Sequence, residues 1–248
     1  MLHYFIPEEE QAELRARSAE PPPEPQAEPE PELEPKPEVV PSPALAPSRW
    51  CLVVHPERPL HAALAVDLAH ALAGRGGASE LVATVSRPRL VPHAKQVAWR
   101  VADDAADGLE RCLSATTRAL LVLTPEQLER LLPQLPAGLL DGVILPIDAS
   151  SRGLAAALPL LRPLRGVSNS LRIGALFLGA DDPGRSLFAR LNGAARRQLG
   201  VAIENLGALK RSAEDFRLLL EGRSTLDADP DSASSRALRD VARRLTQD

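Results

Sequence analysis

The chain has 248 residues, of which 44% are hydrophobic and 25% charged, and its formal net charge is −4 at pH 7. This length suffices for one domain with a sizeable core, and no apolar run approaches the roughly 18 residues that a membrane-spanning helix needs. Its two isolated cysteines form no C-x-x-C pair, and no basic segment followed by an apolar one marks a signal peptide, so we expect a cytoplasmic protein.

Residues 1–18 combine apolar and aromatic side chains with four Glu and two Arg, for a net charge of −2. Pro7 followed by Glu8–Glu10 favours a helix start, because acidic residues suit the positive end of the helix dipole. Such a segment is typical of a short peptide that folds on a partner, and equally of one that packs on its own domain or frays. The candidate partner-binding residues are Tyr4, Phe5, Ile6, Gln11, Leu14 and Arg15.

Residues 19–48 hold 11 of the 24 prolines, seven Glu and one Lys. Proline lacks a backbone donor and like charges repel, so the composition predicts an extended, disordered linker with a net charge of −6. The remaining residues, 49–248, then carry about +4, which is too little to argue for nucleic acid. We interpret the many arginines of the predicted helices as solvated helix faces. The sequence thus predicts a peptide (1–18), a linker (19–48) and one domain (49–248).

Within the domain, apolar runs alternate with segments of helical period. The first helix is marked by Leu60, Leu64, Leu68 and Leu72, which recur every four residues. Further helices are predicted over 125–132, 152–162, 185–198, 211–220 and 233–246, with Asp231 or Ser232 capping the last. The predicted strands are Trp50–Val54, Leu81–Val85, Ala119–Leu123, Gly142–Ile147, Leu171–Leu178 and Val201–Leu206.

Several of these strands are apolar along their whole length, as in strands buried on both faces of a mostly parallel sheet. The alternation predicts an α/β fold with a doubly wound sheet flanked by helices. Right-handed crossovers place the loops that follow the strands at one sheet edge, which is the default ligand site. The turn His55–His61 lies there, between the first strand and first helix, and it contains no glycine.

Residues 55–76 resemble the start of the MinD/ParA/FlhG group of P-loop ATPases without a gap. The second half matches closely, through Leu64–Ala69, Ala71–Ala73 and Arg75–Gly76. The resemblance implies a P-loop NTPase fold, and it extends over most of 50–246. Residues 171–207 resemble a strand, helix and strand of FlhG and MinD, and residues 229–245 resemble the closing helix. Gln11–Arg15 resembles the FlhG activator peptide, with one spacer residue instead of two.

The resemblance also shows which positions of the phosphate loop are replaced. The family's signature lysine falls on Pro56, and its P-loop lysine and magnesium-binding Thr/Ser fall on His61 and Ala62. The metal-linked aspartate of the family's second motif falls on Leu123, although Thr124 and Pro125 after it are kept. A phosphate loop needs inward-facing backbone N–H groups and glycine curvature, so these changes oppose Mg-ATP binding. The vestigial loop comprises Pro56, Glu57, Arg58, Leu60, His61, Ala62 and Leu123.

We therefore expect a pseudo-ATPase without cofactor, metal or catalytic residues, because the five histidines show no metal-ligand spacing and no catalytic set is recognisable. The resemblance implies a protein partner in a cell-envelope machine, and the flagellar assembly machinery is the first candidate. A homodimer would not be nucleotide-sandwiched, and membrane insertion is not expected. The alternatives are a divergent nucleotide-binding ATPase of cellulose synthesis, pilus, division or DNA partition systems, which would use His61 and Arg58, and a nonspecific DNA-binding protein.

Overall fold

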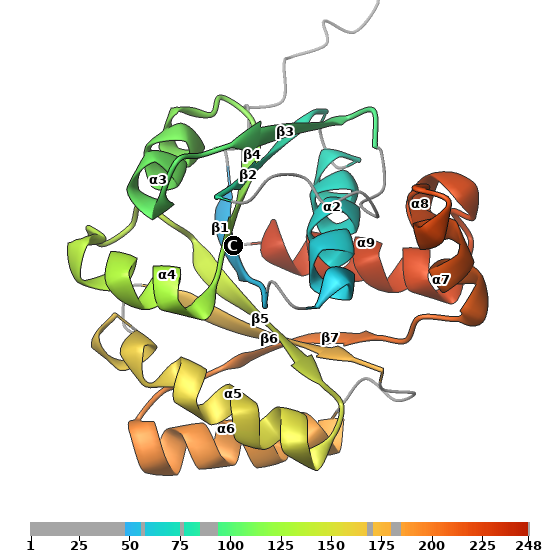
Figure 1. The fold of residues 1–248 in the computed structure, drawn as a ribbon. Coiled ribbons are helices and arrows are strands. Elements are labelled where there is room, and N and C mark those ends of the chain that lie inside the picture. Colours follow the sequence, from blue (N-terminus) through green and yellow to red (C-terminus); the bar gives the residue numbers. More distant parts are fainter. Residues whose placement is uncertain are drawn as a thin grey trace, which may run out of the picture. The chain divides into compact units, whose positions relative to one another are not determined.

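The computed structural model describes residues 48–55, 58–74, 77–84, 94–167, 171–179 and 185–247. Their strands pair in the order β3-β2-β4-β1-β5-β6-β7, and every pair is parallel (Figure 1). This confirms the predicted doubly wound α/β fold. The strands are β1 (Arg49–Val53), β2 (Ser79–Ala83), β3 (Val97–Val101), β4 (Arg118–Leu123), β5 (Gly142–Asp148), β6 (Arg172–Leu178) and β7 (Glu204–Leu209).

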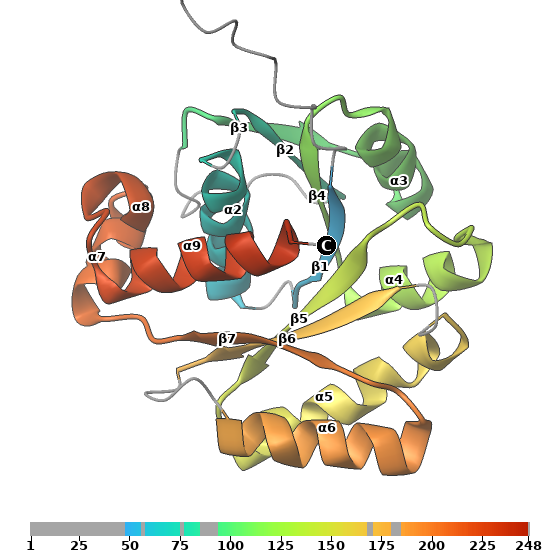
Figure 2. The ribbon, with the colours of Figure 1, turned by 180° about the vertical axis from the view of Figure 1, so that it is seen from behind.

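Helices cover both faces of this sheet, each over its own apolar core. One face carries α3 (Ala105–Ser114), α4 (Pro125–Leu131), the 3-10 turn η1 (Leu132–Gln134), α5 (Ser151–Leu161), the 3-10 turn η2 (Pro163–Gly166) and α6 (Arg185–Leu199). The other carries α2 (Pro59–Ala73) and α9 (Ala233–Leu245), beside α7 (Ala213–Leu220) and α8 (Thr225–Ala228) (Figure 2). Among the described residues, no helix is long and apolar enough to cross a membrane.

Side-chain caps explain where several of these helices begin. Thr124 and Gln127 form a capping box at the start of α4, and Ser212 and Asp215 form another at α7. Ser232 Oγ accepts the Ser235 N–H at 3.0 Å, which confirms the predicted cap of the last helix. Each of these oxygens satisfies a backbone donor that has no partner within its helix.

The sequence pattern missed β3, α3 and the short α8, and it displaced two strands. Only Gly108 and Cys112 of α3 are buried, and no residue of the edge strand β3 is buried, so both leave a weak apolar pattern. The strand predicted over Leu81–Val85 is β2, at Ser79–Ala83. The strand predicted over Val201–Leu206 is β7, at Glu204–Leu209. Val201 and Ile203 lie just before the strand and are buried. The apolar pattern in the sequence therefore begins earlier than the strand does.

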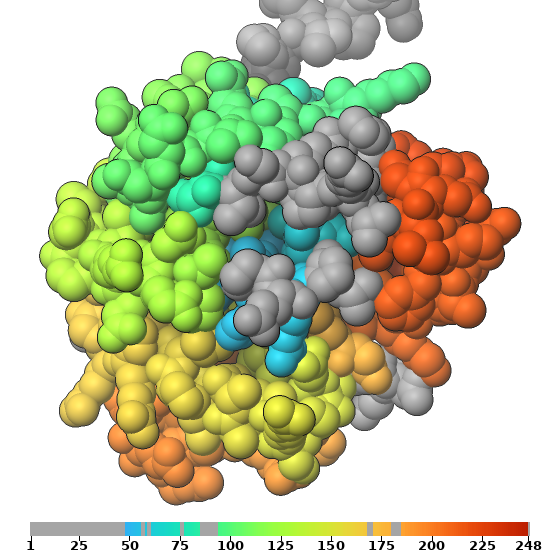
Figure 3. Space-filling model, in the orientation of Figure 1, coloured from blue at the N-terminus to red at the C-terminus, as the bar shows by residue number. Residues whose placement is uncertain are grey.

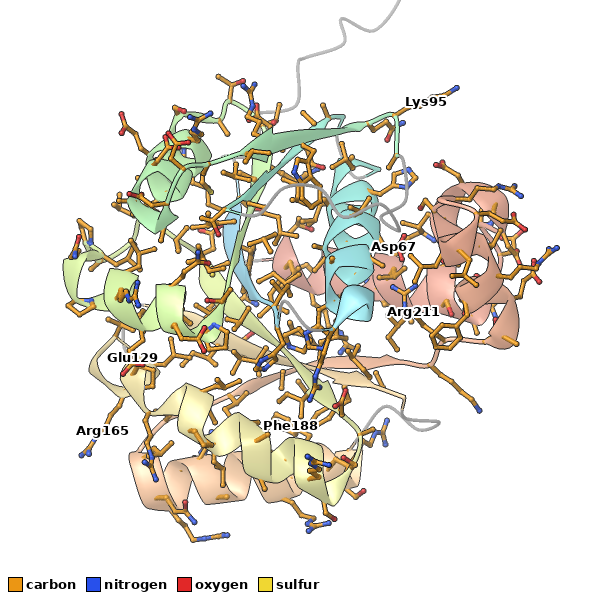
Figure 4. All side chains as sticks on the ribbon, in the orientation of Figure 1. Asp67, Lys95, Glu129, Arg165, Phe188 and Arg211 are labelled. Atoms are coloured by element: carbon orange, nitrogen blue, oxygen red, sulfur yellow. The ribbon has the colours of Figure 1, made fainter. Side chains whose placement is uncertain are left out.

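Three long-range hydrogen bonds hold the second helical layer together and join it to the sheet. Arg211, just after β7, donates to the Asp67 carboxylate of α2 at 2.9 Å (Figure 4). Ser224 Oγ donates to the same carboxylate at 3.2 Å. The Asp67 and Arg211 side chains are 1% and 11% exposed. On β1, the indole of the fully buried Trp50 donates to the Leu245 carbonyl at 3.1 Å, which ties the first strand to the last helix.

Candidate functional site

The carboxyl ends of β1, β4 and β5 are neighbours in the sheet, so the residues after them meet at one edge. The register continues past the strands, because the Val54 N–H donates to the Leu123 carbonyl at 2.8 Å. Three elements are thereby brought together: the turn after β1, the start of α4 at Thr124, and Asp148 at the end of β5. This is the edge at which the sequence placed the ligand site.

In the described part of the turn between β1 and α2, three backbone donors bond to groups of the same turn. The Arg58 N–H donates to the His55 carbonyl and the His61 N–H donates to the Arg58 carbonyl, both at 2.9 Å. The His55 N–H donates to His61 Nδ1 at 3.4 Å, and Pro59, at the first turn of α2, has no N–H. A phosphate loop instead directs such donors at the anion, so the described part of this turn does not fit a polyphosphate.

An ion pair joins this turn to the end of β5. Arg58, at the N-terminal boundary of α2, donates from its guanidinium to the Asp148 carboxylate, and both side chains are about half exposed. In this pair the Arg58 guanidinium already faces a carboxylate, so its positive charge is less available to a nucleotide phosphate. The pair also presents a carboxylate at the edge where the anion would lie.

His61 lies beneath the turn and is only 1% exposed. Burial, reinforced by the nearby Arg58 and His55, lowers the pKa of His61 from 6.5 to about 4. The ring is therefore neutral near pH 7, and its Nδ1 accepts the His55 N–H, so its proton belongs on Nε2. This buried Nε2 has no hydrogen-bond partner among the described residues.

The end of β4 is apolar where the resemblance implies a metal-linked carboxylate. Leu123 is fully buried in the core of the α3–α6 face. The polar groups near the end of β4 bond to one another. The Thr124 N–H donates to Gln127 Oε1 at 2.9 Å, and Gln127 Nε2 donates to Thr84 Oγ1 at 2.7 Å. No group of three or more His, Cys, Asp or Glu residues with metal-binding geometry occurs among the residues described.

A small apolar pocket lies behind this edge, between α4 and α5. Its volume is about 160 Å³, below the roughly 300–1,000 Å³ of typical small-molecule sites. It offers one carboxylate, from Glu129, and no basic group. The lining residues are Val53, Pro125, Leu128, Glu129, Pro159, Leu160 and Pro163.

The structure brings Arg58 and His61 of the predicted loop together, with Ala62 half-buried in α2 and Leu123 buried nearby. Leu60 belongs to α2. Two residues that sequence reasoning missed are Asp148 and Asp67. Asp148 could have been found as an acid ending an apolar strand, and Asp67 as a lone acid in an apolar helix. The remaining predicted positions lie outside the described residues: Pro56, Glu57, Tyr4, Phe5, Ile6, Gln11, Leu14 and Arg15.

No family model and no curated protein matches the sequence, but solved structures match the fold. MinD cell division protein of Aquifex aeolicus superimposes with a TM-score of 0.56 and 13% identity, over 80% of this chain and 96% of that one. The chain has a MinD-like fold. MinD in the Aquifex aeolicus MinC:MinD complex gives a TM-score of 0.55 at 12% identity, over 80% and 95% of the two chains. Pyrococcus horikoshii MinD complexed with Mg-ADP gives 0.52 at 14% identity, with the same coverage.

The MinD-like fold gives the edge site its context. The Pyrococcus horikoshii protein was solved with Mg-ADP, and the Aquifex aeolicus protein in a complex with the protein MinC. The fold is thus found with a nucleotide in one case and with a protein partner in another.

Proposed function

We propose that this chain is a non-catalytic, MinD-like pseudo-ATPase that acts through protein–protein contacts. The observation that carries the proposal is the internal hydrogen bonding of the described residues His55, Arg58 and His61. The donors of His55, Arg58 and His61 are taken by groups of the same turn, and Pro59 has none. Leu123 at the end of β4 adds no oxygen for a metal.

Isothermal titration calorimetry with Mg-ATP and Mg-ADP on the full chain tests the proposal. We expect no binding heat up to millimolar nucleotide. Micromolar affinity for either nucleotide would refute it, and a turnover assay would then decide whether the chain hydrolyses ATP. The variant Asp148→Ala, which frees Arg58 from its ion pair, shows whether that pair alone blocks the site.

The second candidate function is a divergent nucleotide binder, and the buried Nε2 of His61 favours it. A buried donor without a partner has a free-energy cost, and a phosphate or ribose oxygen could accept from it. Nucleotide binding that His61→Ala abolishes and Arg58→Ala weakens would support this candidate. Binding that both variants retain would place the nucleotide elsewhere.

For the biological role, we propose regulation or positioning of a cell-envelope machine, with flagellar assembly as the first expectation. The proposal rests on the resemblance of residues 171–207 and of Gln11–Arg15 to FlhG proteins. Deleting the gene should change the number or placement of flagella, and a chain lacking residues 1–18 should fail to restore them. Normal flagella together with altered cellulose, pili or division would redirect the proposal to those systems.

A further inference from the structure

The layer formed by α5, η2 and α6 carries seven arginines and no acidic residue. These segments, residues 151–166 and 185–199, contain no Lys, Asp or Glu, so their formal charge is +7. We call their exposed surface the arginine face; it lies at the lower side of Figure 3, where Arg165 points away from the ribbon in Figure 4. The other exposed members are Arg152, Arg162, Arg185, Arg190, Arg196 and Arg197.

These arginines differ from the four arginines of α9. In α9, Arg243 pairs with Asp240 at 2.8 Å, and Arg244 donates to the Asn205 carbonyl at 3.0 Å. On the arginine face, Arg196 donates to Asn192 at 3.3 Å. Arg162, Arg190 and Arg197 form no side-chain hydrogen bond or ion pair with any residue that the structure describes.

A concentrated single-sign charge favours a polyanionic partner. Arginine presents a planar fork of donors that matches a carboxylate in a bidentate pair. The domain as a whole carries only about +4, and the chain −4, so long-range attraction to nucleic acid is weak. The matching charge within this chain is the glutamate-rich segment 19–48, with a net charge of −6.

We propose that the arginine face binds residues 19–48 of a second copy of this chain. Each copy carries both charges, so two copies can exchange segments reciprocally and form the contact twice, as in other two-fold symmetric dimers. The spacing is compatible: an extended proline-rich chain rises about 3.1 Å per residue, so Glu28 to Glu34 spans about 19 Å. Helix α6, with its 15 residues, is about 22 Å long.

Sedimentation of the full chain at low and high salt tests the proposal with charge-removing variants. The face variant carries Arg162→Gln, Arg190→Gln, Arg196→Gln and Arg197→Gln. The segment variant carries Glu28→Gln, Glu30→Gln, Glu32→Gln and Glu34→Gln. A control removes the same charge elsewhere, through Arg130→Gln, Arg217→Gln, Arg223→Gln and Arg243→Gln, all exposed in the domain.

We expect the wild type and the control to dimerise at low salt and dissociate as salt rises. Each of the other variants should weaken dimerisation about tenfold or more, while their mixture should form a heterodimer, because one intact face then meets one intact segment. A monomer at all salt concentrations would overturn the proposal. So would dimerisation that survives in either variant, or duplex DNA that binds the face more tightly than a synthetic peptide of residues 19–48.

Discussion

Arg211 reaches from the end of β7 to the carboxylate of Asp67 in α2, 2.9 Å away and 144 residues earlier in the chain. The Asp67 side chain is buried and that of Arg211 is only 11% exposed, and the pair joins the end of the sheet to the helix that follows the candidate site. Burial raises the pKa of Asp67, and the charge of Arg211 and the hydroxyl of Ser224 oppose this effect. The charged form of the Asp67 carboxylate is therefore stabilised by partners that belong to other elements.

Removing one member of this pair should destabilise the domain strongly. Asp67→Ala leaves the Arg211 guanidinium buried without its counter-ion, at an expected cost of about 3–5 kcal/mol in the free energy of unfolding. Urea denaturation measures this cost. The control is Asp240→Ala, whose pair with Arg243 is about half exposed and should contribute no more than about 1 kcal/mol. Equal costs for the two variants would contradict the structural role of Asp67.

The stability of the domain should depend on pH through His61. Its folded pKa, about 4, lies below the ordinary 6.5, so between these pH values the unfolded chain binds a proton that the folded chain excludes. Stability should fall as pH drops through this window, by about 3 kcal/mol from this group. His61→Gln should lose that part of the pH dependence. Parallel curves of unfolding free energy against pH for wild type and variant would contradict this prediction.

Both cysteines should be unreactive in the folded domain. Cys51 and Cys112 are free and fully buried. Burial raises the pKa of the Cys51 thiol and raises that of Cys112 to about 12, so the reactive thiolate is scarce at neutral pH. A thiol-reactive dye should label neither cysteine until denaturant unfolds the chain. Rapid labelling in native buffer would show that the core opens locally.

Gly153, in the first turn of α5, should be sensitive to substitution. A Cβ added there would overlap the Asp148 backbone carbonyl, which must move. We expect Gly153→Ala to lower the free energy of unfolding by about 1–3 kcal/mol and to disturb the Arg58–Asp148 pair. Gly166→Ala is the matched control, because its Cβ would meet no atom within 4 Å. Thermal unfolding of the two variants side by side separates the clash from a general glycine effect.

The five central strands of the sheet could be predicted from the sequence because they are apolar along most of their length. The sequence was insufficient for β3 and α3, where few residues are buried and the pattern is weak. The position of the loop residues Arg58 and His61 followed from the strand-turn-helix order. Their partners did not, because Arg58 meets Asp148 across 90 residues, and such pairing arises only when the strands are assembled side by side.

The bond from the Trp50 indole to the Leu245 carbonyl spans 195 residues. During synthesis β1 leaves the ribosome early, yet its neighbours β4 and β5 and its last partner in α9 follow much later. Such long-range contacts form slowly, and the apolar strands stay exposed until their partners have been synthesised. Trp50, buried beside that helix, is therefore an optical reporter of the step in which α9 packs on the sheet.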